Sequence, residues 1–149
     1  MRRRIILVAV LLIVVVAGVG LWKYFEKAPN YAAKEPDVAV TAKEFLSAFD
    51  KDTAAASKRF MDKIVRVTGR VQSFDSSAVV LGEEGSPSSI VIGLDKRNQN
   101  SIAHLKVGET GTLQGKFSGY RKSSGDAEDL LSSLGTTVNV DYGGVVNNK

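Results

Sequence analysis

The sequence predicts a β-rich α+β chain: a closed five-stranded barrel preceded by an amphipathic helix, with one transmembrane helix at the N-terminus. Three observations lead to this prediction. An uncharged apolar run follows three arginines near the start of the chain. A stripe of apolar residues with helical spacing comes next, and beyond Lys63 the apolar residues recur at every second position.

The apolar run extends from Ile5 to Trp22 and contains no charged residue. At 1.5 Å per residue, a helix of this length spans about 27 Å, close to the hydrocarbon thickness of a bilayer. Arginines at 2–4 precede the run, and Tyr24 and Phe25 join Trp22 in an aromatic belt. We therefore expect residues 1–27 to hold cytoplasmic arginines and a single-pass anchor in a bacterial inner (cytoplasmic) membrane, with the domain on the periplasmic or extracytoplasmic side.

A cleaved signal peptide is the alternative for the same segment. Such peptides also begin with basic residues, and small residues suited to cleavage occur at Ala17, Gly18 and Gly20. Their apolar stretch is usually about 7–15 residues, which is shorter than the run observed. A lipoprotein signal requires a cysteine, and the chain has none.

Residues 28–40 are expected to form a linker, because they contain two of the three prolines and show no periodicity. The domain is then assigned to residues 41–149. Thr41 and Glu44 fit a capping box that opens a helix ending near Phe49, with a stripe of apolar residues on one face. A second helical piece is expected from Thr53 to Phe60, with Phe60 and Met61 buried at its end.

Five strands follow. In the first, Val65, Val67, Gly69 and Val71 share one face, and Gly69 suggests a bend or bulge. The next three are expected at 78–81, 89–94 and 110–117. The last strand opens with residues 135–142 and ends near Val146, and short helices are expected at 98–105 and 126–134. Three strands, a helix and two more strands is the order of the OB (oligonucleotide/oligosaccharide-binding) barrel.

The charge distribution argues against a nucleic-acid binder, although the net charge is +4. The first 27 residues hold five of the 20 basic residues and one of the 16 acidic residues, so the rest of the chain holds 15 of each. Duplex binders normally carry a basic surplus that displaces counterions. The basicity therefore belongs to the predicted anchor, and we expect nucleic acid to be an unlikely ligand of the neutral domain.

A spaced set of apolar residues and glycines resembles the tRNA-anticodon-like OB family, small bacterial proteins that carry an N-terminal membrane or export segment before one OB domain. In the helices and first strand the set is Phe45, Phe49, Asp52, Ala56, Phe60, Lys63, Val67, Gly69 and Val71. In the second half it is Lys106, Gly108, Gly115, Gly119 and Tyr120. The resemblance covers about residues 45–146 and implies an OB fold. Family members often carry cysteines where Phe117 and Val140 stand, so no function that needs those cysteines is expected here.

No catalytic or metal-ligating set emerges from the sequence, and we expect no enzyme activity and no cofactor. With no cysteine and one histidine, His104, thiolate zinc sites and histidine pairs are excluded. The predicted ligand-binding residues lie on the polar face of the first strand and at the end of the fourth: Arg66, Arg70, Gln72, Lys116, Tyr120, Arg121 and Lys122. A solvated strand face has the same pattern. The function expected is a non-enzymatic, membrane-anchored binding module for an unknown protein or a cell-envelope polymer; the alternative is a single-stranded nucleic-acid or tRNA-binding OB domain.

Overall fold

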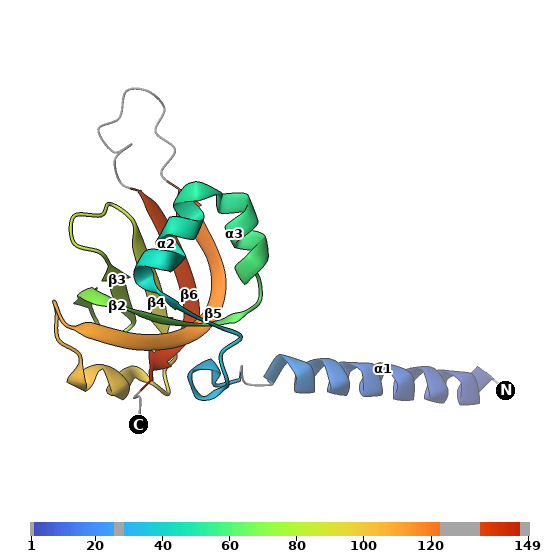
Figure 1. The fold of residues 1–149 in the computed structure, drawn as a ribbon. Coiled ribbons are helices and arrows are strands. Elements are labelled where there is room, and N and C mark those ends of the chain that lie inside the picture. The colour runs from blue at the N-terminus through green and yellow to red at the C-terminus, as the bar shows by residue number, and fades with distance from the viewer. Residues whose placement is uncertain (1, 26–28, 123–134, 147–149) are drawn as a thin grey trace, which may run out of the picture.

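The fold is a closed five-stranded barrel with two short helices packed against it (Figure 1), seen in a computed structural model of the whole chain. The structure describes residues 2–25, 29–122 and 135–146, and within the first helix it describes the side chains of residues 11–20, 23 and 24. The short helix predicted at 126–134 lies outside the described residues.

Strands β2 (Ile64–Phe74), β3 (Ala78–Gly82), β4 (Ser89–Leu94), β5 (Thr110–Lys122) and β6 (Thr136–Val145) form the barrel. Their order around the barrel is β2-β3-β4-β6-β5, and β5 pairs with β2 to close it. Only β4 and β6 run parallel among these neighbours; the other pairs are antiparallel. The 3-10 helix η2 (Gln99–His104) connects β4 to β5. This order confirms the OB topology predicted from the sequence.

The alternation that predicts β2 is confirmed by burial. Val65, Val67 and Val71 are each no more than 1% exposed, while Arg70 on the other face is exposed. Gly69 also faces inward, but it does not mark a bulge: it pairs regularly with Gly111, and the register of β2 against β3 breaks later, between Val71 and Ser73.

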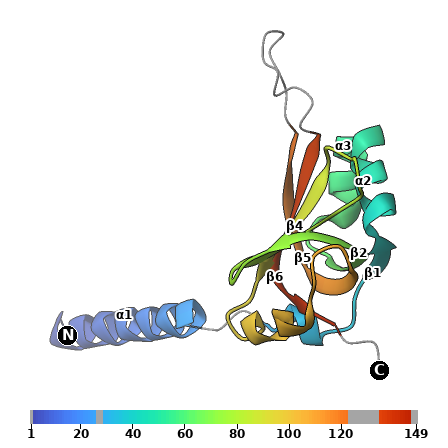
Figure 2. The ribbon, with the colours of Figure 1, turned by 90° about the vertical axis from the view of Figure 1, so that its left-hand side faces the viewer.

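The helices α2 (Ala42–Lys51) and α3 (Thr53–Phe60) lie together on one side of the barrel (Figure 2). The capping box of Thr41 and Glu44 is confirmed, and Asp52 ends α2 and caps α3. The missing side chain of Gly69 explains how α2 reaches the sheet, since a Cβ there would lie 2.5 Å from the Cβ of Ala42.

Aromatic rings form the contact between the helices and the barrel. Phe45 packs edge-on against Phe60 with 4.7 Å between ring centroids, and Phe49 lies 5.6 Å from Phe117 of β5. All four side chains are at most 2% exposed. Burying one such side chain contributes about 1.5–3 kcal/mol. Met61, which the sequence places in this core, is instead 53% exposed, because it lies in the turn after α3.

The segment expected to be a linker contains two ordered elements. A 3-10 helix, η1 (Tyr31–Ala33), contacts β5 and β6, and a sixth strand, β1 (Val38–Thr41), pairs in parallel with β2. Asp37 closes the start of this pairing, since its amide donates to the carbonyl oxygen of Ile64 at 2.9 Å and its carboxylate accepts from the Ile64 amide at 2.8 Å. Residues after Pro29 are therefore part of the packed domain.

The N-terminal helix α1 (Arg2–Phe25) includes the whole predicted anchor and runs away from the barrel (Figures 1 and 2). Its described apolar side chains are exposed, from Leu11 at 65% to Val19 at 54%. Among the described residues, no helix meets both the length and the apolar character required to cross a membrane. The predicted span of residues 5–22 reaches beyond the described side chains at both ends, so the anchor stays a prediction.

Candidate functional site

The seven predicted site residues do not converge. Arg70 stands opposite Thr110 at the start of β5, whereas Arg121 stands opposite Thr137 near the end of that strand. Strand residues rise by about 3.3 Å each, so positions 110 and 121 are separated by most of the length of β5. The predicted residues instead fall into separate groups along the barrel, each with its own partners.

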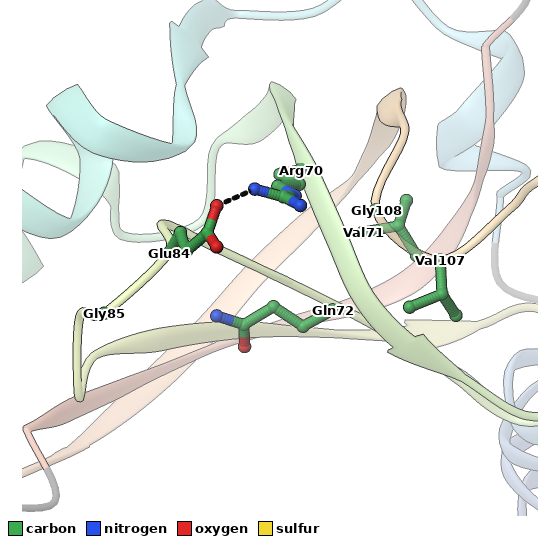
Figure 3. Close-up of a pocket in the computed structure, with 7 residues that line it drawn as sticks. All are labelled: Arg70, Val71, Gln72, Glu84, Gly85, Val107 and Gly108. Carbon is green, nitrogen blue, oxygen red and sulfur yellow. Dashed lines mark hydrogen bonds and ion pairs between the residues drawn. The ribbon is translucent and has the colours of Figure 1, made fainter.

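Arg70 and Gln72 line a pocket of about 320 Å³ between β2, the β3–β4 turn and the turn before β5 (Figure 3). Arg70 forms an ion pair with Glu84 across this pocket. The Gln72 amide donates to the carbonyl oxygen of Glu83 at 3.3 Å. Both charged side chains are largely solvated, at 47% and 79% exposed, so the pair contributes at most about 1 kcal/mol. Its main consequence is that the Arg70 charge is already balanced inside the domain.

Arg66 serves the packing of the N-terminal segment. Its Nε donates to the side-chain oxygen of Gln114 at 2.9 Å, and Gln114 is fully buried. The Gln114 Nε2 in turn donates to the carbonyl oxygens of Tyr31 and Lys34, each at 2.6 Å. This network fixes η1 to β5, which the alternating pattern of β2 alone cannot reveal. Arg66 is half-buried and already hydrogen-bonded, so it is poorly placed to contact a ligand.

Lys116 pairs with Asp62 of the α3–β2 turn, with 2.9 Å between the ammonium nitrogen and the carboxylate. The hydrogen bond to Asp62 is the main cause that raises the pKa of Lys116 above its usual range, and the nearby Tyr31 and Tyr142 raise it further. Lys116 therefore keeps its charge at neutral pH, and Asp62 neutralises it.

Tyr120, Arg121 and Lys122 lie at the exposed end of β5, which continues past the predicted end at Phe117. The ring of Tyr120 is 39% exposed and lies 5.5 Å from the ring of Phe49, so it extends the buried aromatic cluster to the surface. Arg121 and Lys122 are exposed, and neither forms an ion pair or a hydrogen bond through its side chain with a described residue. Of the predicted cations, these two have no described partner and can therefore meet a ligand.

The outer face of β3 and β4, where OB barrels commonly bind ligands, offers small side chains. Val80 stands opposite Val91, and Ala78 opposite Gly93, all half-buried. Phe74 is 37% exposed at the end of β2. The described part of this face presents no basic residue from β3 or β4, in contrast to the basic grooves that hold single strands.

The described residues bring no set of three histidine, aspartate or glutamate side chains together as metal ligands. His104 is exposed at the end of η2. The sequence reasoning missed Asp62, Glu84 and Gln114, which balance or hold three of the predicted site residues. Only the polar character of these residues was visible in the sequence.

Comparison with solved structures finds several proteins that resemble this chain in part. One is a lipoprotein from Klebsiella pneumoniae subsp. pneumoniae provisionally assigned as nucleic-acid-binding, with 16% identity and a TM-score of 0.52 over 73% of this chain and 91% of that chain. The asparaginyl-tRNA synthetase of Entamoeba histolytica gives 14% identity and a TM-score of 0.40, over 77% of this chain and 25% of that chain. A provisionally assigned aspartyl-tRNA synthetase of Leishmania major gives 11% identity and a TM-score of 0.39, over 89% of this chain and 26% of that chain.

At 16% identity, the likeness to the Klebsiella lipoprotein supports the OB fold alone. A search of curated proteins gives no significant match. The tRNA_anti-like family, however, matches residues 1–125, which is most of the chain. The match includes α1, β1, the helices α2 and α3, and the first four strands of the barrel. The sequence resemblance is thereby confirmed, and the chain belongs to the tRNA_anti-like family.

Proposed function

We propose that the chain is a non-enzymatic binding module for a protein or a cell-envelope polymer, held outside the cytoplasm by an N-terminal membrane helix. The observation that carries this proposal is that three cations of the predicted basic site are engaged within the domain. Arg66 is bonded to Gln114, and Arg70 and Lys116 form ion pairs with acidic residues. A phosphate backbone would have to compete with these partners at each position, whereas a protein or a polymer with few charges would not.

Membrane attachment is supported by the uncharged residues 5–22 and by the exposed apolar side chains of α1 from Leu11 to Val19. Exposing this much apolar surface to water is unfavourable, while a bilayer would cover it. The arginines at 2–4 favour a cytoplasmic N-terminus, which would place the barrel on the other side.

We expect a reporter that is active only outside the cytoplasm to be active when it is fused after Lys149. The full-length mass is expected in the membrane fraction and should resist extraction by salt and alkali. As a control, Val14→Arg combined with Val15→Arg puts two charges into the apolar run, at about 2.5–3.5 kcal/mol each, and should abolish insertion. A shortened, soluble product beginning near Leu21 would identify the segment as a signal peptide and contradict the anchor.

Single-stranded nucleic acid is the second candidate, favoured by one observation: Phe74 and Tyr120 expose aromatic surface on which bases could stack. Stacking contributes about 1–3 kcal/mol per base. The provisional assignment of the Klebsiella lipoprotein points the same way. Against it stands the electrostatic term, because Arg121 and Lys122 would neutralise only about two phosphates, giving a salt dependence of roughly −1.4 in log K against log salt.

We expect no sub-micromolar binding of short single-stranded DNA, RNA or tRNA to the full-length chain in detergent micelles at about 150 mM salt. Fluorescence anisotropy measures this directly. Arg121→Ala combined with Lys122→Ala tests the free cations, and Lys106→Ala, which removes a cation that pairs with Glu109 elsewhere on the surface, is the matched control. Sub-micromolar binding that weakens in the double variant or in Tyr120→Ala, and not in the control, would replace the proposed function with the second candidate.

A further inference from the structure

A second pocket, of about 260 Å³, lies where β5, β6 and the α3–β2 turn meet. Apolar and charged side chains line it together: Met61, Asp62, Lys116, Ser118, Asp141 and Tyr142. Of these, only Lys116 is among the ligand-binding residues predicted from the sequence. The buried Phe117 of the aromatic cluster also lines the pocket, so it is continuous with the core.

Irregular strand pairing forms this pocket. The register between β5 and β6 shifts twice, between Gln114 and Lys116 and again between Phe117 and Gly119. At the first of these shifts Gly115 lets β5 approach β6 closely, because a Cβ there would lie 2.8 Å from the carbonyl oxygen of Asp141. Such bulges redirect side chains and are over-represented next to functional sites. Here they fall at the three β5 residues that line the pocket, Lys116, Phe117 and Ser118.

Two backbone positions at this pocket adopt the left-handed conformation. Asp62 has φ 59° and Tyr142 has φ 55°, and they are the non-glycine residues with positive φ in the described chain. Aspartate tolerates this conformation, whereas for a bulky residue such as tyrosine it is a genuine outlier. Residues held in this way cluster at functional sites. The strain positions a tyrosine ring that is 47% exposed and 5.8 Å from the ring of Tyr31.

Among the residues that the structure describes, one carboxylate at the pocket has no ion-pair partner. Lys116 and Asp62 neutralise each other at 2.9 Å. Asp141 is exposed, and no described residue forms an ion pair or hydrogen bond with its carboxylate. A ligand that completes this pocket therefore brings a single positive charge, together with an apolar part that covers Met61 and the ring of Tyr142.

We propose that this pocket takes an arginine side chain of a partner protein. A guanidinium can pair with the Asp141 carboxylate through two parallel hydrogen bonds and can stack on the Tyr142 ring. The methylene stem of the arginine covers the exposed side chain of Met61. Lysine provides neither the planar stack nor the fork of donors, so arginine is the better match. This inference rests on the proposed function in taking the partner to be a protein, and it adds the chemistry of the contact.

The test uses the full-length ¹⁵N-labelled chain in detergent micelles, titrated with N-acetyl-arginine methylamide and followed by its amide spectrum. We expect saturable shifts at Asp62, Ser118 and Tyr142, with a dissociation constant in the range of about 1 mM, since a single side chain contributes only a few kcal/mol. The citrulline analogue has the same shape without the charge and should bind at least about tenfold more weakly. Asp141→Asn should weaken arginine binding by a similar factor, whereas Glu109→Gln, a matched change on the far surface, should not.

Equal shifts with the arginine and citrulline analogues, or an unchanged affinity in Asp141→Asn, would overturn the proposal. An undisturbed spectrum of free Asp141→Asn shows that the variant is folded, so loss of binding can then be assigned to the carboxylate. If neither the arginine analogue nor nucleic acid binds, the proposed arginine site is rejected and the proposed function is retained. If single-stranded RNA shifts the same amides, both the arginine site and the proposed function are overturned.

Discussion

Replacing Val67 by aspartate is expected to unfold the barrel. Val67 is fully buried in the middle of β2, where it stands opposite Leu113 of β5 and Val40 of β1. A carboxylate at this position would have no cationic partner, and burying such a group costs several kcal/mol even after the protein relaxes. A small domain is stable by only about 5–15 kcal/mol, so one buried charge removes a large part of that margin. Loss of the cooperative thermal transition in circular dichroism would be the result.

Two variants separate the effect of charge from the effect of position. Val67→Thr keeps the branched shape and adds only a hydroxyl, so we expect an intermediate loss of about 1–3 kcal/mol. Arg70→Ala removes a solvated side chain on the opposite face of β2, together with its ion pair to Glu84, and should cost no more than about 1 kcal/mol. Arg66→Ala, a neighbour that the alternating pattern would also treat as a surface change, is unsuitable as a control because it bonds to the buried Gln114. Equal melting temperatures for Val67→Asp and Arg70→Ala would show that the register of β2 is wrong.

The parts of the fold that could be predicted are those whose signals are local. The capping box needs only Thr41 and Glu44, three residues apart, and the inward face of β2 needs only alternation along one strand. Strand β1 was missed because its four residues, Val38–Thr41, follow a proline and are stabilised by a strand that begins 26 residues later. The pairing partner, and not the intrinsic pattern, makes this segment a strand.

The length of β5 explains why the candidate site does not converge. The strand continues past its predicted end at Phe117 to Lys122, so its last three residues lie far from Arg70. Residue type also could not show that Asp62, Glu84 and Gln114 would engage the predicted cations, since these partners come from other parts of the chain.

A large effect confined to the N-terminal segment is expected when Gln114 is replaced by methionine, which has a similar length and no amide. The Gln114 side chain makes three hydrogen bonds: it accepts from Arg66 and donates to the carbonyl oxygens of Tyr31 and Lys34. Leaving a buried polar group unpaired costs about 1–3 kcal/mol. Because η1 lies at the edge of the domain, it can undock and expose its carbonyl oxygens to water at a lower cost than unfolding the barrel.

We therefore expect the segment around η1 to open while the barrel stays folded. Hydrogen exchange at the amide of Asp37, which donates to Ile64, should accelerate at least about tenfold, while the amide of Phe117, which donates to Lys63, should change little. Thr112→Val is the matched control, because it removes a half-buried hydrogen bond of 3.0 Å to Thr68 from the same strand without touching η1. Unchanged exchange at Asp37 in Gln114→Met, or the same acceleration in Thr112→Val, would show that the buried amide does not hold this segment.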